Sequence, residues 1–303
     1  MENTSLQQQL LEAGVHFGHL KKKWNPKMLP YIFAEKKGIH IIDLNKTVEG
    51  LQECAAALKA IARSGKKIMF VATKKQAKEI VSECARKVNM PYVTERWLGG
   101  MLTNFNTIRK SVKKMQSIEK MLNDGSAENL TKKERLTLSR DKDKLEKVLG
   151  GIAAISRVPS ALFLVDIGHE HIAMAEAKKL GISTFGMVDT NCDPNKVDFA
   201  IPANDDATKS ISIIVNYLTA AIAEGLQERQ SDKDSDEDHS DTEESAEAKA
   251  ARFENKADGG DDRNKRGGGR GPGGPGAGGQ PKRRVAGPGQ GGRRPAGGPG
   301  GAR

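Results

Sequence analysis

The sequence predicts an α/β protein whose parallel sheet is covered by helices on both faces. Residues 159–194 contain a complete strand–helix–strand unit, and similar apolar runs alternate with helical stretches elsewhere along the chain. A strand that returns through one short helix pairs in parallel with the first strand by a right-handed crossover. Because neither strand of this unit alternates polar and apolar residues, we expect helices on both faces of the sheet.

Local signals define each element of this central unit. An apolar run over Ala161–Val165 follows Pro159, a residue that disfavours helix just before it. Apolar residues then recur near helical spacing up to Leu180, and Gly181 is placed to end the helix. Ile182–Val188 is the second strand.

The elements before this unit follow the same alternation. Thr73 and Gln76 have the spacing of a capping box, which predicts a helix that runs to about Val88. The other expected elements are a helix over 5–13, a strand over 39–44, a helix over 47–63, and strands over 67–72 and 91–93.

Two amphipathic helices interrupt the alternation. The first has an apolar stripe in steps of three and four residues, and the second starts at a capping box formed by Thr131 and Glu134. The stripes are Ile108, Val112, Met115, Ile118 and Leu122, and then Leu138, Leu145, Val148 and Ile152. We therefore predict an antiparallel helical hairpin, residues 104–157, inserted between two parts of the α/β domain, residues 1–103 and 158–226.

The chain after the hairpin ends in a long segment of biased composition. A last strand is expected over 199–202 and a last helix over 207–226. We expect residues 227–303 to form a disordered tail, acidic over 228–262 and basic and rich in glycine and proline over 263–303. The basic part either adds sequence-indifferent affinity for RNA or is passive.

The charge distribution limits the partners. Residues 1–227 carry a formal charge of +9, residues 228–262 carry −9, and residues 263–303 carry +10. A basic folded part favours a polyanionic partner, although a lysine surplus also occurs on ordinary surfaces.

Other features concern the compartment. Three cysteines without a Cys-x-x-Cys pair indicate no disulfide framework and a reducing cytoplasm. The first 14 residues do not have the pattern of a signal peptide, and no apolar run reaches membrane-spanning length.

Basic and stacking residues concentrate in four stretches. Ammonium and guanidinium groups beside aromatic or amide side chains suit phosphate contact and base stacking, although each stretch alone also fits a solvated loop. The predicted RNA-binding residues are Lys21, Lys22, Lys23, Trp24, Lys27, Lys74, Lys75, Arg96, Trp97, Asn104, Asn106, Arg109, Lys110, Lys113 and Lys114. His16 and His19 lack nearby cysteines or a carboxylate pair at zinc spacing, so we expect no metal and no cofactor.

Several long motifs resemble one family. GVHFGH, WNPKM, ERWLGGMLTNFNTIR, PSALFLVDIGHEHIAMAEAKKLGISTFGMVDTNCDP and IPANDDA, spread over residues 3–226, are similar to the bacterial small-subunit ribosomal protein S2 family. The resemblance implies a flavodoxin-like sheet with a protruding coiled-coil hairpin. It also implies a non-enzymatic protein that binds small-subunit ribosomal RNA where head and body meet, beside neighbouring ribosomal proteins. Docking of the large ribosomal protein S1, and hence a part in translation initiation, is implied as well. The segment from Arg263 onward has no counterpart in this resemblance.

The alternative is an enzyme or a flavodoxin-like nucleotide-binding module. Open parallel sheets bind ligands at the carboxyl ends of their strands, where Asp166, His169, His171 and Asp189 are expected. Asp166 and His169 are spaced to form an acid–base pair. Because no nucleophile elbow, P-loop or glycine fingerprint accompanies them, we interpret them as helix-cap and turn residues.

Overall fold

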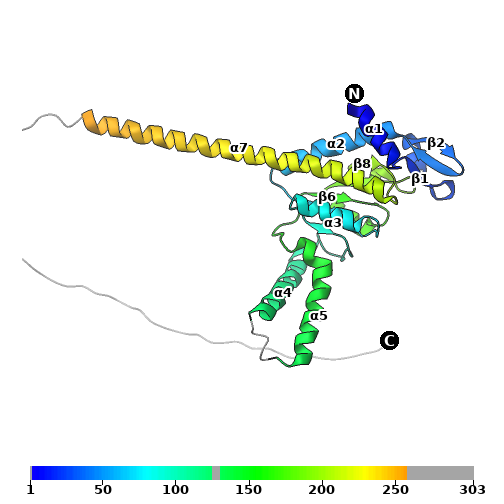
Figure 1. The fold of residues 1–303 in the computed structure, drawn as a ribbon, viewed down its shortest axis with the longest axis horizontal. Coiled ribbons are helices and arrows are strands. Elements are labelled where there is room, and N and C mark those ends of the chain that lie inside the picture. Colours follow the sequence, from blue (N-terminus) through cyan, green and yellow to red (C-terminus); the bar gives the residue numbers. More distant parts are fainter. Residues whose placement is uncertain (1, 125–129, 258–303) are drawn as a thin grey trace, which may run out of the picture. The chain divides into compact units, whose positions relative to one another are not determined.

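A five-stranded parallel sheet forms the centre of the computed structural model, which describes residues 2–124 and 130–257 (Figure 1). Its strands lie in the order β5-β4-β6-β7-β8, which is the flavodoxin-like order. They are β4 (Ile68–Val71), β5 (Tyr92–Val93), β6 (Ala161–Leu164), β7 (Ser183–Val188) and β8 (Phe199–Pro202). The predicted fold class is confirmed.

Each face of this sheet has its own apolar core. On one face Phe70, Phe163 and Phe185 are fully buried beneath helices α1 (Glu2–Glu12), α2 (Leu44–Arg63), α3 (Lys78–Lys87) and α7 (Thr208–Ala257). On the other face Leu162 and Leu164 pack against α6 (His171–Leu180) and the base of the helical hairpin. The strands are buried on both faces, which explains their unbroken apolar sequence.

A second, smaller sheet precedes the central one, and this arrangement corrects the prediction of a first parallel strand over 39–44. β3 (Ile39–Ile42) is the middle strand of an antiparallel sheet, between β1 (Phe17–Leu20) and β2 (Ile32–Lys36). Two 3-10 helices, η1 (Lys21–Lys23) and η2 (Pro26–Tyr31), connect β1 to β2. The sequence predicted no strand over residues 17–20 or 32–36, so the apolar run over 39–44 was assigned to the wrong sheet.

The predicted hairpin is formed by α4 (Phe105–Asn123) and α5 (Lys132–Leu149), which pack against each other (Figure 1). The capping box at Thr131 and Glu134 is present. Ile152 belongs to the following 3-10 helix η4 (Gly150–Ile152), not to α5 as predicted. A Cβ on Gly151 would lie 2.1 Å from the carbonyl oxygen of Tyr92, so this leg of the hairpin meets β5 backbone to backbone.

Helix boundaries also differ from the prediction in α1, which spans Glu2–Glu12, and at the starts of α2 and α3. The side chain of Asp43 caps α2, which therefore begins at Leu44, earlier than expected. The predicted capping box at Thr73 is wrong: Thr73 donates to Glu170 instead, and α3 begins at Lys78. The predicted end of α6 is confirmed, since Gly181 has a left-handed φ of 65°.

Helix α7 does not end at Leu226 as predicted but continues to Ala257. Its extension carries carboxylates to the end of α2, where Glu228 lies 2.9 Å from Lys59 and Asp232 lies 3.0 Å from Arg63. Helix-favouring Glu, Ala and Lys are frequent over residues 243–257, whereas Ser and Asp, which favour helix less, dominate residues 231–242. The remaining predicted tail, residues 258–303, lies outside the described residues. Within the described ranges no helix is long and apolar enough to cross a bilayer.

Replacing Gly225 by alanine should destabilise the fold. A Cβ at Gly225 would lie 2.4 Å from the carbonyl oxygen of Lys59, so α7 and α2 would have to separate. In an ordinary helix Gly→Ala stabilises by about 1 kcal/mol, whereas here we expect a loss of about 1–3 kcal/mol from overpacking. Urea unfolding measures the change.

The matched control is Gln227→Ala, an exposed position in the same turn of α7 that should change the free energy of unfolding little. If Gly225→Ala proved as stable as the parent protein, the close approach of α7 and α2 would be wrong.

Candidate nucleic-acid interface

The basic loop after β1 keeps two free ammonium groups. Lys21 and Lys27 form ion pairs of 2.7 Å with Glu35 and Asp193, so their charges are compensated locally. Lys22 and Lys23 are exposed and form no ion pair with any described residue. These two lysines are therefore available to a phosphate.

The indole of Trp24 in the same loop is only partly accessible to a base that could stack on it. Its side chain is half-buried, and its ring centroid lies 5.1 Å from that of His40. The following residue, Asn25, ties the loop to the main sheet because its backbone N–H donates to the carbonyl of Thr190 at 2.8 Å. The loop is thus fixed at its base, with its lysines outward.

The segment between β5 and α4 separates Arg96 from Trp97. Arg96 is exposed, but Trp97 is only 7% exposed and belongs to the core on the hairpin side of the sheet. Trp97, predicted from the sequence to be an RNA-binding residue, is a packing residue whose indole lies in this core. Asn104 and Asn106 are exposed, and the Oδ1 of Asn104 already accepts from Thr107 at 2.9 Å.

A buried carboxylate that sequence reasoning missed holds this segment. Glu176 of α6 is 8% exposed. Its Oε1 accepts from the Trp97 indole at 3.2 Å and from the Gly100 N–H at 2.7 Å. Its Oε2 accepts from the N–H groups of Leu102 and Thr103 at 3.0 Å each, and from the Thr103 hydroxyl at 3.1 Å.

These hydrogen bonds also determine the charge state of Glu176. Burial raises the pKa of its carboxyl, but the backbone N–H groups and the indole outweigh burial and hold that pKa below its usual range. A signal was present in the sequence, since Glu176 shares a helix face with Ala173, Ala177 and Leu180. A lone acid on an apolar face requires buried donors.

Helix α4 of the hairpin displays a group of four exposed cations. Ile108, Val112 and Met115 of α4 are buried, as their spacing predicts. The basic residues between them are exposed and make no ion pair within the described part of the chain: Arg109, Lys110, Lys113 and Lys114. One side of α4 therefore packs and the other presents positive charge.

Lys74, another predicted RNA-binding residue, is paired with carboxylates of the protein itself. Its Nζ lies 3.1 Å from Asp166, 2.8 Å from Asp205 and 2.6 Å from Asp206. Burial lowers the pKa of the Lys74 ammonium, but the hydrogen bonds to these carboxylates outweigh it and raise that pKa. Its neighbour Lys75 is exposed and forms no ion pair with a described residue.

His19 joins the same carboxylate cluster from β1. Its Nδ1 lies 2.9 Å from Asp189, and its pKa is raised first by that hydrogen bond. Asp205 is fully buried, and burial together with the neighbouring carboxylates Asp166 and Asp189 raises its pKa to about 7.

The same cluster contains the only described group of side chains arranged to hold a metal ion. Donor atoms of His19, Asp205 and Asp206 lie within 4.8 Å of one another. Lys74 already supplies positive charge to both of these carboxylates. His16, the other histidine considered as a ligand, is not part of this group.

The acid–base pair considered for an enzyme is not formed. The carboxylate of Asp166 accepts the backbone N–H groups of Gly168 and His169 at 3.0 Å each, as expected for a turn residue. The His169 imidazole instead lies 3.4 Å from the Thr73 hydroxyl. Both histidine and threonine line an open pocket of about 450 Å³ at the carboxyl ends of β4 and β6, which Arg96 also borders.

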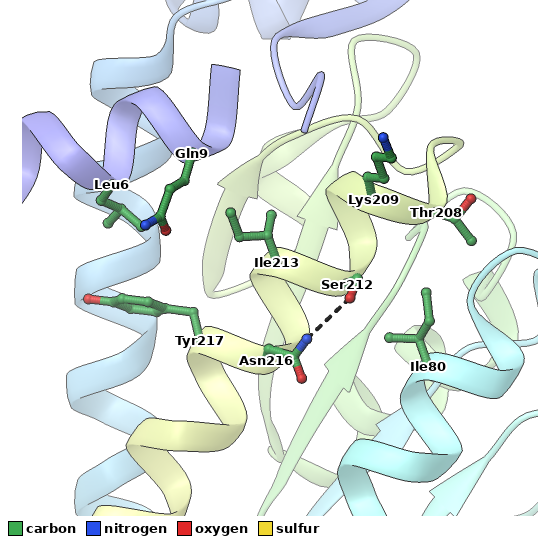
Figure 2. A pocket seen from close by; sticks show the side chains of 9 residues that line it. All are labelled: Leu6, Gln9, Ile80, Thr208, Lys209, Ser212, Ile213, Asn216 and Tyr217. Atoms are coloured by element: carbon green, nitrogen blue, oxygen red, sulfur yellow. Dashed lines mark hydrogen bonds between the residues drawn. The ribbon is translucent and has the colours of Figure 1, made fainter. Parts of the chain in front are cut away.

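A separate groove of about 680 Å³ lies among α1, α3 and α7 (Figure 2). Leu6, Ile80, Ile213 and Tyr217 give it an apolar lining, and Asn216 donates to Ser212 at its rim at 3.1 Å. Of its described lining residues, Lys209 alone is charged. The groove therefore lacks the cation density that a polyanion requires and is not part of the candidate interface.

Comparison with known proteins agrees with the motifs. The family described as "Ribosomal protein S2" matches residues 10–225. The chain is 65% identical over 225 residues to "Small ribosomal subunit protein uS2" of Cytophaga hutchinsonii, covering 74% of this chain and 89% of that protein. It is 63% identical over 224 residues to the protein of that name from Bacteroides thetaiotaomicron, covering 74% and 81%. For Porphyromonas gingivalis the identity is 61% over 225 residues, covering 74% and 80%.

Replacing Lys74 by methionine should leave buried carboxylates without a counter-charge. We expect a loss of about 3 kcal/mol in the free energy of unfolding at pH 8, the scale for removing one partner of a buried ion pair. The deficit should shrink toward pH 5, because Asp205, whose pKa is raised to about 7, then binds a proton in the folded state and no longer needs a counter-charge. Urea unfolding at the two pH values measures it.

The control is Lys75→Met, one residue away, exposed and without an ion pair among the described residues. It should change stability by less than about 0.5 kcal/mol at both pH values. A Lys74→Met protein with no deficit at pH 8 would contradict the role assigned to this ammonium group.

Proposed function

Because this chain belongs to the ribosomal protein S2 family, we propose that it is a structural component of the small ribosomal subunit that contacts ribosomal RNA through exposed, unpaired cations. The match of residues 10–225 to the family is the observation that carries the proposal. In this role the chain works on the ribosome in the cytoplasm, catalyses no reaction and takes no small-molecule substrate.

The proposed RNA contacts follow from which predicted cations remain free. Lys74 is excluded because three carboxylates surround it, and Trp97 because it is buried. Lys21, Lys27, Trp24 and Asn104 are partly engaged within the protein and contribute less. The principal contacts in this proposal are Lys22, Lys23, Lys75, Arg96, Asn106, Arg109, Lys110, Lys113 and Lys114.

The cations of α4 support phosphate contact most strongly. Arg109 and Lys113 are one helical turn apart on a helix whose opposite side is buried, so their positions are fixed by packing. Cations that are already held in place lose little conformational entropy when they bind a phosphate, and they have no ion pair to break. Their binding releases counterions from the nucleic acid. The contact positions the protein and reads shape rather than base sequence.

A second contact is proposed for the open face of the small sheet. Phe17 is paired with Ile41 and Leu20 with Ile39, and side chains directly opposite in antiparallel strands share a face. Phe17 and Leu20 are 48% and 53% exposed. Exposed apolar groups collected on one face favour a protein partner. We assign this face to the large ribosomal protein S1, the partner that the family resemblance implies.

Neutralising Arg109 or Lys113 to alanine should weaken binding to small subunits depleted of this protein. Removing one solvent-exposed hydrogen bond of about 1–1.4 kcal/mol lowers affinity roughly fivefold to tenfold. The slope of log affinity against log salt should fall by about one unit for each phosphate that the variant no longer neutralises. Sedimentation binding assays at several salt concentrations measure both quantities.

Lys66→Ala is the matched control, since Lys66 is exposed, has no described ion-pair partner and lies between α2 and β4. Affinity and salt slope should be unchanged there. If Arg109→Ala and Lys113→Ala behaved like this control, the α4 cations would not be contacts.

Replacing Phe17 by serine should reduce retention of protein S1 by about tenfold, because an exposed apolar anchor is removed at little cost to folding. Leu136→Ser is the control, since Leu136 is 52% exposed but lies on α5. Quantifying S1 on reconstituted subunits separates the two variants. Equal S1 content in both would refute this assignment without affecting RNA contact.

A further inference from the structure

The direction in which α4 leaves the sheet depends on a segment without regular structure. β5 ends at Val93 and α4 begins at Phe105, and no helix or strand is assigned between them. Arg96 lies near the start of this segment, and the cations of α4 begin at Arg109, just beyond its end. A group that orders this segment therefore also fixes Arg96 within it and the cations of α4 that follow it.

The structure assigns this ordering to Glu176: we propose that it is a positioning residue for RNA binding, which holds residues 97–103 and thereby aims Arg96 and the α4 cations. This inference rests on the proposed function. Glu176 makes no contact with RNA itself, since it is buried in the core between α6 and the segment. Its effect passes through the hydrogen bonds it accepts.

The hydrogen bonds of Glu176 are well suited to fixing a loop. All five come from one short stretch, and they divide between the two carboxylate oxygens, with Trp97 and Gly100 on one and Leu102 and Thr103 on the other. Bonds to a carboxylate are stronger than neutral ones. The two ends of the stretch are therefore fastened to a single group on α6.

The two legs of the hairpin are held differently. The leg after α5 is held by close backbone packing of Gly151 on Tyr92, which needs no polar partner. The leg before α4 has buried N–H donors that are satisfied by Glu176. Glu176→Gln replaces one of the two carboxylate oxygens by an NH₂ group. The N–H donors that face this NH₂ group then have no acceptor, while the remaining oxygen still accepts from the other donors.

Glu170 provides a matched control within the same region. It is 3% exposed, precedes α6, and accepts from the N–H and hydroxyl of Thr73. None of the hydrogen bonds described for it comes from residues 97–103. Substituting it therefore removes a buried carboxylate of similar kind without releasing the segment that leads into α4.

The experiment compares Glu176→Gln, Glu170→Gln and Arg109→Ala in the full chain. Urea unfolding reports stability, amide hydrogen exchange reports order at Gly100, Leu102 and Thr103, and salt-dependent binding to depleted small subunits reports RNA contact. For Glu176→Gln we expect faster exchange at these three amides. We also expect affinity about tenfold lower, a coupling of about 1.4 kcal/mol, with a salt slope lower by one to two units.

Glu170→Gln should lose stability, but only Lys75 among the proposed contacts lies near the segment that Glu170 holds. This substitution should therefore lower affinity less than Glu176→Gln does and leave exchange at Gly100, Leu102 and Thr103 unchanged. Should Glu176→Gln fold poorly, Thr103→Ala removes one of the five donors from an exposed residue and should lower affinity by about twofold to threefold, with exchange raised in the same stretch.

The outcomes separate the inference from the function on which it rests. If Arg109→Ala weakens binding but Glu176→Gln and Thr103→Ala do not, the positioning role is overturned and RNA contact stands. If Glu170→Gln weakens binding as much as Glu176→Gln, the effect is general destabilisation and the positioning role is again overturned. If Arg109→Ala has no effect, the proposed α4 contact itself fails.

Discussion

The carboxyl edge of the parallel sheet is organised by one constraint: a carboxylate removed from water must find donors or a counter-charge. Glu176 gathers residues 97–103, and Glu170 holds the segment after β4 through Thr73. Lys74 brings Asp166 together with Asp205 and Asp206. In open α/β sheets this edge is where ligands bind. Here much of it is occupied by the protein's own acids and their partners, which suits a scaffold better than an enzyme.

That arrangement decides which cations remain available to a partner. Lys74 and Lys75 are adjacent in sequence, yet the first neutralises buried acids and the second is exposed. Lys21 and Lys22 differ in the same way. Lys21 forms an ion pair with Glu35, whereas Lys22 forms none with a described residue. Net charge cannot make this distinction, because it counts satisfied and unsatisfied groups alike. Local pairing is therefore the more useful guide to a polyanion-binding surface.

Sequence periodicity predicted those parts of the fold that are determined by local rules. The 161–188 unit, the α4 stripe and the cap at Thr131 each depend on residues close in sequence. The errors came from tertiary competition. Thr73 was expected to form a capping box with Gln76, but its hydroxyl donates to Glu170. Residues 39–44 were assigned to the main sheet, although the strand formed there pairs with β1 and β2. Glu176 went unnoticed because its donors lie about 75 residues away along the chain.

The Arg96–Trp97 pair shows why site prediction from composition has a systematic limit. An arginine beside a tryptophan fits a stacking surface for RNA, and it equally fits a loop that buries its aromatic ring to hold the cation outward. The structure has the second arrangement, with the indole in the core and hydrogen-bonded to Glu176. The buried tryptophan thereby fixes the backbone next to the exposed arginine. Arginine and tryptophan both suit nucleic acid by composition. Here the buried Trp97 anchors the chain, and Arg96 is therefore held in an exposed position.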